Sequence, residues 1–378
     1  MTMKKRILIL LCAFFTLSLP FAARDNDGVT LFMTAPAYSG NQEIAKFPLK
    51  TGASLPTIGT VTGTRVNLRA EPSVSSAVVL RFEGGELVEV LEKAPEQSGE
   101  GYPWYSVATR DGSKGWVYGQ FLAVDMVPPK FALAAPDGSQ VILLYGGDGR
   151  PLMEKAVHRF THCIFDGVLR PVVYGEYQEQ GAEWNGRETG RYFGDLGGFL
   201  FRVEGKPLSL PPDDFGGSDA LLVDDDYARA AGIVALKKKP AKVSPDLRKE
   251  FEKRYGRTLK ECVRIAGGAD SGVAVYAMEF KPKGTSALGV VALVAPEGTY
   301  CLDFPADYNE QSTWSVDDEG NFYPEYYSVG SLMKLADGYE LTLHKPAAES
   351  ASSWLMVTKG GKLVEQAGSS SYRYISPE

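Results

Sequence analysis

Short apolar runs separated by polar turns dominate the chain from residue 58 onward. The runs "AVVLRF" and "ELVEVLE" flank the pair Gly84-Gly85, which is a two-residue hairpin signal. In a second hairpin, Val107 and the pair Trp116-Val117 flank the turn "DGSKG". Five short strands within residues 58–124 predict a small closed barrel, because closure removes exposed strand edges.

The aromatic residues of the last hairpin define the expected inside of this barrel. Trp116 lies between Gly115 and Val117, and an indole buries a large area in a small domain, so we expect Trp116 to be mainly core. Alternation along "YPWYSVA" places Trp104 on one face of its strand and Tyr105 on the other.

Residues 130–378 are richer in strand signals than in helix signals, and the pair Pro128-Pro129 marks the boundary before them. One clear helix is expected at about 244–255, with Ser244 as its N-cap and Gly256 as its C-terminal stop. The predicted fold class is therefore mainly β. A small barrel precedes a larger β-rich domain, which is either a β-sandwich or an α+β arrangement.

The first residues have the layout of a secretory signal peptide, expected to span residues 1–23. Basic residues at 4–6 precede an apolar run over 7–19, and the small pair Ala22-Ala23 follows. The alternative is an uncleaved anchor, but the run is shorter than the roughly 20 residues that cross a bilayer. We expect a periplasmic or extracellular protein without a membrane span after signal removal, in which residues 24–57 form an N-terminal segment or linker.

The chain is acidic, with a formal net charge of −7. Residues 1–23 carry three positive charges and no negative ones, so their removal leaves 37 basic against 47 acidic residues, a net charge of −10. This excess argues against non-specific binding to nucleic acid or to anionic membrane surfaces.

Three cysteines remain in the expected mature chain: Cys163, Cys262 and Cys301. In an oxidising compartment Cys262–Cys301 is the pairing to test, because both residues fall in one strand-rich block. The alternative is that all three are buried and act as small hydrophobic residues.

His158, His162 and Cys163 are the candidates for a metal site. On a helix, histidines four residues apart share a face and could share a zinc ion, whereas in a strand they lie about 13 Å apart. The residue after His158 is Arg159, where a zinc hydrolase has Glu. We therefore expect neither a metal nor another cofactor.

Other catalytic arrangements have little support in the sequence. A GxSxG nucleophile motif is absent, and three histidines supply few general bases. We expect no catalytic residues. The alternative of a cell-wall hydrolase with its active site in residues 130–378 stays open, because the two acids of a glycosidase can lie far apart in sequence.

Three segments occur in order within residues 58–124: "VNLRAEPSVSSAVV", "FEGGELVEVLE" and "WYSVATRDGSKGWVYGQFL". Together they resemble the bacterial SH3-like domain family, while the remainder of the chain resembles no family that we recognise. The resemblance implies an SH3-like barrel that recognises an extended peptide. Its expected partner is the stem peptide of peptidoglycan or an envelope protein.

Aromatic residues crowd both ends of the last hairpin, and an open face of them, with polar residues from "RAEPSVSS", suits an extended peptide. The alternative is that these aromatics only pack the barrel. The predicted ligand-binding residues are Tyr102, Tyr105, Tyr118 and Arg69. The predicted function is that of a secreted or periplasmic, non-enzymatic binding protein.

Overall fold

The computed structural model describes residues 53–95, 101–211, 217–238, 241–268, 271–307, 322–347 and 349–375. The predicted signal peptide and residues 24–52 lie outside this described part. Within it the protein is mainly β, with a six-stranded barrel, a larger β-rich sheet and few helices, which confirms the predicted class. No helix in the described ranges is long and apolar enough to cross a membrane.

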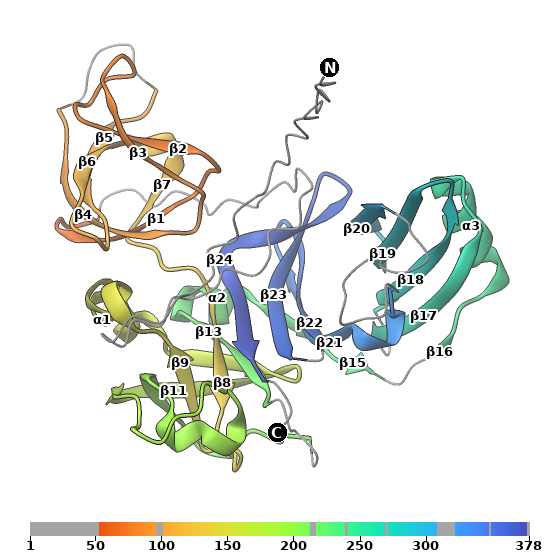
Figure 1. The fold of residues 1–378 in the computed structure, drawn as a ribbon. Coiled ribbons are helices and arrows are strands. Elements are labelled where there is room, and N and C mark those ends of the chain that lie inside the picture. The colour runs from red at the N-terminus through yellow and green to blue at the C-terminus, as the bar shows by residue number, and fades with distance from the viewer. Residues whose placement is uncertain are drawn as a thin grey trace, which may run out of the picture. The chain divides into compact units, whose positions relative to one another are not determined.

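The first barrel is a seven-stranded sheet in the order β3-β2-β6-β5-β4-β1-β7 (Figure 1). Its core holds alternate apolar residues, among them Val61, Val90 and Val107, all fully buried. The strands are β1 (Thr57–Val61), β2 (Val66–Arg69), β3 (Val78–Phe82), β4 (Leu87–Lys93), β5 (Trp104–Ala108), β6 (Lys114–Tyr118) and β7 (Leu122–Val124).

The two predicted hairpins have different outcomes. Strands β5 and β6 pair antiparallel around residues 109–113, as predicted. The prediction for Gly84-Gly85 is wrong, because β3 pairs with β2 and β4 pairs with β1 and β5. Both glycines have positive φ, and the Gly85 amide donates to the Val61 carbonyl, so the turn leads the chain into β4.

The indole predicted for the core is also corrected. Trp116 is half-buried on the outer face of β6, whereas the adjacent Val117 is fully buried in the core. Trp104 on β5, which lies opposite Tyr118 of β6, is the buried indole, with 3% of its surface exposed.

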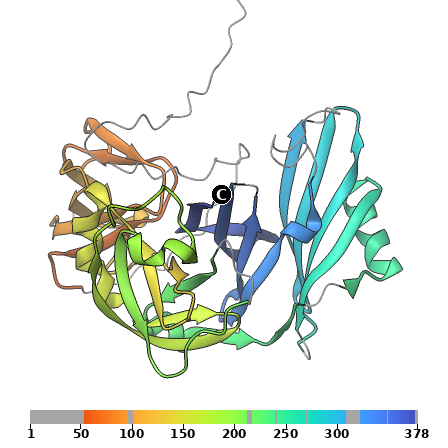
Figure 2. The same cartoon turned by 60° about the horizontal axis from the view of Figure 1, so that its bottom comes forward.

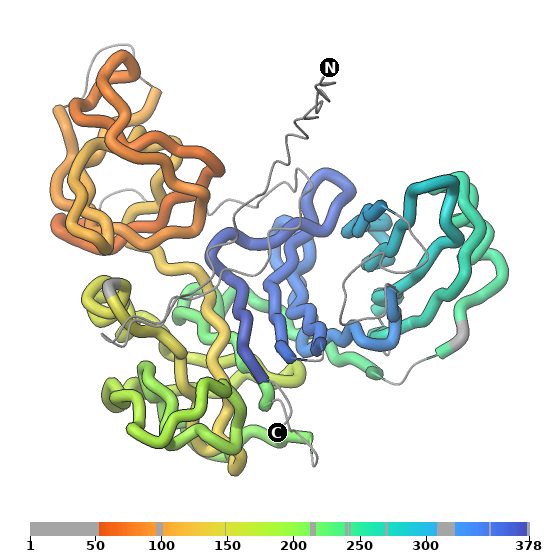
Figure 3. The backbone as a smooth tube through the Cα atoms, viewed as in Figure 1, coloured from red at the N-terminus to blue at the C-terminus, as the bar shows by residue number. Residues whose placement is uncertain are grey.

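A second, closed barrel follows after residues 125–129 (Figure 3). Its strand order is β10-β11-β12-β9-β8-β13, and its core contains Val141, Phe199 and Phe201, with Met153 from the short helix α1 (Arg150–Ala156). The strands are β8 (Lys130–Ala134), β9 (Gln140–Leu144), β10 (His162–Phe165), β11 (Val168–Gln178), β12 (Gly198–Val203) and β13 (Asp219–Val223).

The rest of the chain forms an eleven-stranded sheet (Figure 2). Its path runs β14-β21-β22-β23-β24-β20-β19-β18-β17-β15, and β16 also pairs with β17. The strands are β14 (Gly232–Val234), β15 (Leu236–Lys237), β16 (Ala241–Lys242), β17 (Leu259–Gly268), β18 (Ala274–Lys283), β19 (Ser286–Ala295), β20 (Gly298–Asp307), β21 (Ser328–Leu335), β22 (Gly338–Pro346), β23 (Ser350–Lys359) and β24 (Lys362–Tyr374).

This sheet curves back on itself. The consecutive strands β14 and β15 pair with β21 and β17 respectively, so the stretch 232–237 joins the two ends of the sheet. Val275 and Val291 from one half share a core with Leu341 and Met356 from the other. The alternation of apolar residues along these strands therefore supplies an inner face for a single core.

The predicted helix is confirmed as α3 (Pro245–Tyr255). The Ser244 side chain accepts a hydrogen bond from the Leu247 amide, and Gly256 ends the helix at a φ of 60°. Phe251, with 1% of its surface exposed, packs the helix onto the sheet.

The three cysteines of the described residues form no disulfide. Cys262 lies on β17 and Cys301 on β20, with β18 and β19 between them in the sheet. Three strand spacings separate the two residues by about 14 Å, too far for a bridge. The alternative, that all three are buried, holds for Cys163 and Cys301, whereas Cys262 is only partly buried. Burial raises the pKa of the Cys163 thiol to about 12.

Candidate functional site

A groove of about 180 Å³ lies on the outer surface of the first barrel. Strand β2, the two residues before it and the turn after it form one part of the groove. Strands β5 and β6 and the short turn after β6 form the rest. Its lining residues are Thr64, Arg65, Val66, Asn67, Arg69, Val74, Trp104, Tyr118 and Phe121.

Tyr118 is the centre of an aromatic cluster at this groove. Its ring centroid lies 5.3 Å from that of Trp104 and 6.4 Å from that of Phe121. Tyr102 meets the Tyr118 ring edge-on at 5.9 Å, and its amide donates a hydrogen bond to the Tyr118 hydroxyl. Such contacts hold the rings in fixed orientations, which gives the groove a rigid apolar wall.

Another part of the groove lining is polar and basic. Arg69 Nη1 donates to the Ser76 carbonyl at 2.7 Å, which fixes the guanidinium against the turn after β2. Asn67, two residues before Arg69 on the same strand face, accepts a hydrogen bond from Arg81 Nε at 3.0 Å. Arg65 precedes β2 with a φ of 57°, a conformation that few residues other than glycine adopt.

The four predicted ligand-binding residues have different positions. Arg69 and Tyr118 both line the groove. Tyr102 lies beside it, in contact with Tyr118, and 41% of its surface is exposed. Tyr105 points to the other face of β5 and packs against the barrel core, so we leave it out of the candidate site.

Sequence reasoning missed Thr64, Arg65 and Asn67 as lining residues. Asn67 could have been predicted, because strand alternation places residues 67 and 69 on one face. Arg65 could not be predicted in this way, because it precedes the strand and has a left-handed backbone conformation, with a φ of 57°.

Comparison with known proteins concerns this barrel. Residues 64–123 match the family model of the bacterial SH3 domain. The match covers one segment and not the barrel and sheet that follow. Neither the curated proteins nor the solved structures gave a match to the chain. The bacterial SH3 domain indicates binding. Of the four predicted site residues, Arg69 and Tyr118 line the groove in this domain and Tyr102 contacts Tyr118, whereas Tyr105 packs on the barrel core.

The histidines considered for a metal site lie on different elements. His158 is in a 3-10 turn after α1 and packs edge-on against Tyr174, with ring centroids 5.0 Å apart. His162 begins β10, and its Nδ1 lies 3.0 Å from the Thr161 hydroxyl. Among the described residues no group of three or more metal-binding side chains comes together.

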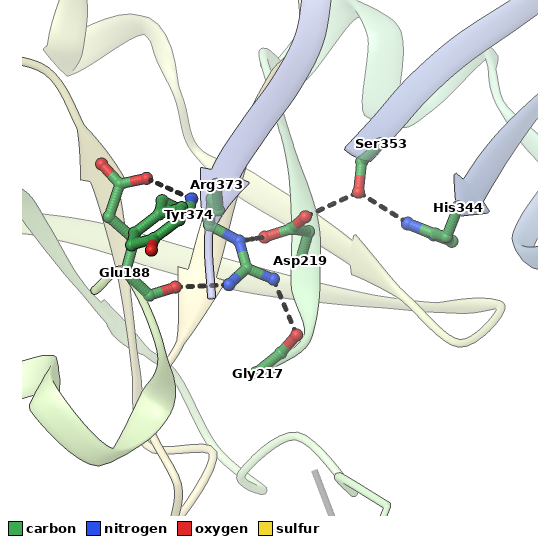
Figure 4. Close-up of polar contacts among 7 residues, drawn as sticks. All are labelled: Glu188, Gly217, Asp219, His344, Ser353, Arg373 and Tyr374. Carbon is green, nitrogen blue, oxygen red and sulfur yellow. Dashed lines mark hydrogen bonds and ion pairs between the residues drawn. The ribbon is translucent and has the colours of Figure 1, made fainter. Parts of the chain in front are cut away.

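A second polar cluster joins the closed barrel to the eleven-stranded sheet (Figure 4). Asp219 on β13 accepts hydrogen bonds from Arg373 Nε on β24 at 2.8 Å and from the Ser353 hydroxyl on β23 at 2.6 Å. The other two guanidinium nitrogens of Arg373 donate to the carbonyls of Glu188 and Gly217. Asp219 and Arg373 have 9% and 1% of their surface exposed.

His344 completes this cluster, because its Nδ1 lies 2.7 Å from the Ser353 hydroxyl. Ser353 donates its proton to Asp219, so His344 Nδ1 must donate to Ser353. A catalytic triad has histidine between serine and carboxylate, whereas serine occupies the middle here. Burial lowers the pKa of His344 to about 4, so the imidazole is neutral at pH 7. The hydrogen bonds of the cluster link β13 of the closed barrel to β22, β23 and β24 of the sheet.

Proposed function

We propose that the protein is a binding protein of the cell envelope whose first barrel binds an extended wall peptide. The observation that carries this proposal is the groove in the bacterial SH3 domain, whose lining combines packed aromatic rings with polar and basic side chains. Aromatic side chains supply large contact areas at low entropic cost, and they dominate the affinity of many peptide sites.

The exposed strand beside the groove supports an extended ligand. Strand β3 is at one end of the described sheet order, and its Val78 and Val79 have 42% and 48% of their surface exposed. Val74, in the turn between β2 and β3, lines the groove and is 71% exposed. An extended peptide can follow such a strand with its side chains alternately in the groove and in solvent.

Two observations support the proposed cellular location. Bacterial SH3 domains are often extracellular or associated with the cell wall. The first 23 residues have the pattern of a secretory signal peptide. We propose that the mature protein meets its ligand in the periplasm or outside the cell, with peptidoglycan stem peptides as the partner class.

Co-sedimentation of the full mature chain with purified peptidoglycan tests this proposal. Tyr118→Ala removes the central ring of the groove. We expect this variant to bind peptidoglycan with an apparent affinity at least 10-fold lower than that of the unchanged protein. Tyr326→Ala is the control, because it also removes a tyrosine ring, with 41% of its surface exposed, from a position outside the barrel.

The control must bind like the unchanged protein, and circular dichroism must show that both variants are folded. If the unchanged protein does not sediment with peptidoglycan, or if Tyr118→Ala binds as well as Tyr326→Ala, the proposed site is wrong.

A further inference from the structure

We infer that the groove recognises a carboxylate of its peptide ligand through Arg65 and Arg69, while Tyr118 and Phe121 contact the adjoining apolar part. This inference rests on the proposed function, and it assigns the chemistry by which the groove selects among peptides. The two arginines and the two aromatic residues all line the same groove.

The local charge differs in sign from that of the whole chain. Residues 64–82, which run from the start of β2 to the end of β3, contain three arginines and one acidic residue, Glu71. The complete chain has a net charge of −7. A basic groove on an acidic protein favours a negatively charged ligand by complementarity, and it steers such a ligand to this surface.

Arg69 is held in place before any ligand arrives. One of its N–H groups donates to the Ser76 carbonyl, and that contact fixes the plane of the guanidinium. Arginine has five N–H donors in a rigid fork, which matches the two oxygens of a carboxylate. Because the side chain is already ordered, less conformational entropy is lost when the ligand binds.

Arg65 is placed at the groove by an unusual backbone conformation. Its φ of 57° is one of three positive values among non-glycine residues of the described chain. A glycine would adopt this conformation with less strain. Arginine at this position supplies an exposed positive charge to the groove that Arg69 also lines.

The aromatic wall favours a peptide carboxylate over a free inorganic anion. Tyr118 and Phe121, which are both partly exposed, offer apolar surface in the groove that the two arginines also line. Inorganic phosphate has nothing to place on this surface, whereas a carboxylate attached to an aliphatic chain uses both the apolar and the basic part of the lining. We therefore assign an extended peptide with a free carboxylate as the ligand class.

Isothermal titration calorimetry on the full mature chain tests this inference. Two synthetic wall stem peptides of one sequence are compared, one with free carboxylates and one with every carboxylate amidated. We expect the amidated peptide to bind at least 10-fold more weakly, since hydrogen bonds between charged groups contribute about 1.5–3 kcal/mol. Higher salt should weaken only the free acid, and inorganic phosphate should compete weakly.

The variants Arg65→Gln and Arg69→Lys should reduce the difference between the two peptides. Arg69→Lys keeps the charge and loses the fork. Arg110→Gln, in the exposed β5–β6 turn, is the control and should leave the difference unchanged. Equal binding of both peptides would overturn the carboxylate assignment and leave the proposed function standing. Binding of neither would overturn both, and tight binding of inorganic phosphate would replace the peptide carboxylate by a simple anion site.

Discussion

Two arginines in this protein show how similar chemistry is used for different purposes. Arg373 is buried, and its three guanidinium nitrogens donate to Asp219 and to the carbonyls of Glu188 and Gly217. Arg69 lies half-buried at an open groove, where one nitrogen donates to the Ser76 carbonyl and the planar group borders a cavity of about 180 Å³.

The difference teaches where to look for binding. A buried charge is tolerated when its donors are matched inside the protein, and the matched cluster then fixes how two sheets meet. A guanidinium beside aromatic rings at the surface keeps donors available to a ligand. We therefore assign the Asp219–Arg373 cluster to stability and the groove to recognition.

Breaking the buried cluster should give the largest effect. Asp219→Ala leaves the Arg373 charge buried without its carboxylate, and we expect a loss of about 3–5 kcal/mol in the free energy of unfolding. Asp225→Ala is the matched control, because Asp225 pairs with Arg229 on an exposed helix face. That variant should cost less than about 1 kcal/mol. Urea denaturation measures both, and similar small losses would contradict the structural role.

The two indoles of the first barrel allow the stability contribution of a buried ring to be compared with that of a half-buried one. Trp104→Ala removes a side chain with 3% of its surface exposed, and we expect a cost of about 3–5 kcal/mol. Trp116→Ala removes a half-buried ring from the outer face of β6 and should cost clearly less. Thermal unfolding of the full chain compares the two variants. A larger loss for Trp116→Ala would restore that residue to the core.

The buried cluster should also make stability depend on pH. Burial lowers the pKa of His344 in the folded protein to about 4, whereas in the unfolded chain it is about 6.5. The unfolded state therefore binds the proton first as pH falls. The stabilisation is complete above pH 6.5 and declines towards pH 4, by at most about 3 kcal/mol. His344→Gln should remove this part of the slope, and an unchanged slope would mean that other groups cause it.

The smallest effect is expected at the rim of the groove. Tyr102→Phe keeps the ring that meets Tyr118 edge-on and removes a hydroxyl that is not needed for that contact. We expect less than a threefold change in affinity for wall peptide, against the loss of at least 10-fold for Tyr118→Ala. Fluorescence titration compares them, and equal losses would place the centre of the site at Tyr102.

The sequence predicted those features that depend on local patterns. Alternation and the family motifs identified Arg69 and Tyr118, and capping signals located α3. The same alternation could not say which face of β6 is inside. The prediction therefore placed Trp116 in the core, where the structure has Val117. Gly84-Gly85 does form a turn, as predicted. The strand after the turn, β4, pairs with β1, which lies far from β4 in the sequence.

The buried cluster had no local signal at all. Asp219 and Arg373 are 154 residues apart, and Ser353 lies on a third strand. Each is an ordinary polar residue in its own segment, and only the packing of β13 against β23 and β24 brings them together. Long-range pairs of this kind follow from topology, which a pattern of apolar and polar positions does not specify.

The central claim is that recognition occurs at the groove and that the buried cluster takes no part in it. The most direct test is a titration of the ¹⁵N-labelled mature chain with a wall stem peptide, followed by amide chemical shifts. We predict saturable shifts at residues 64–69 and at Tyr118, with no change at Asp219, His344 or Arg373. Shifts gathered around Asp219 and His344 with an unchanged groove would contradict this account.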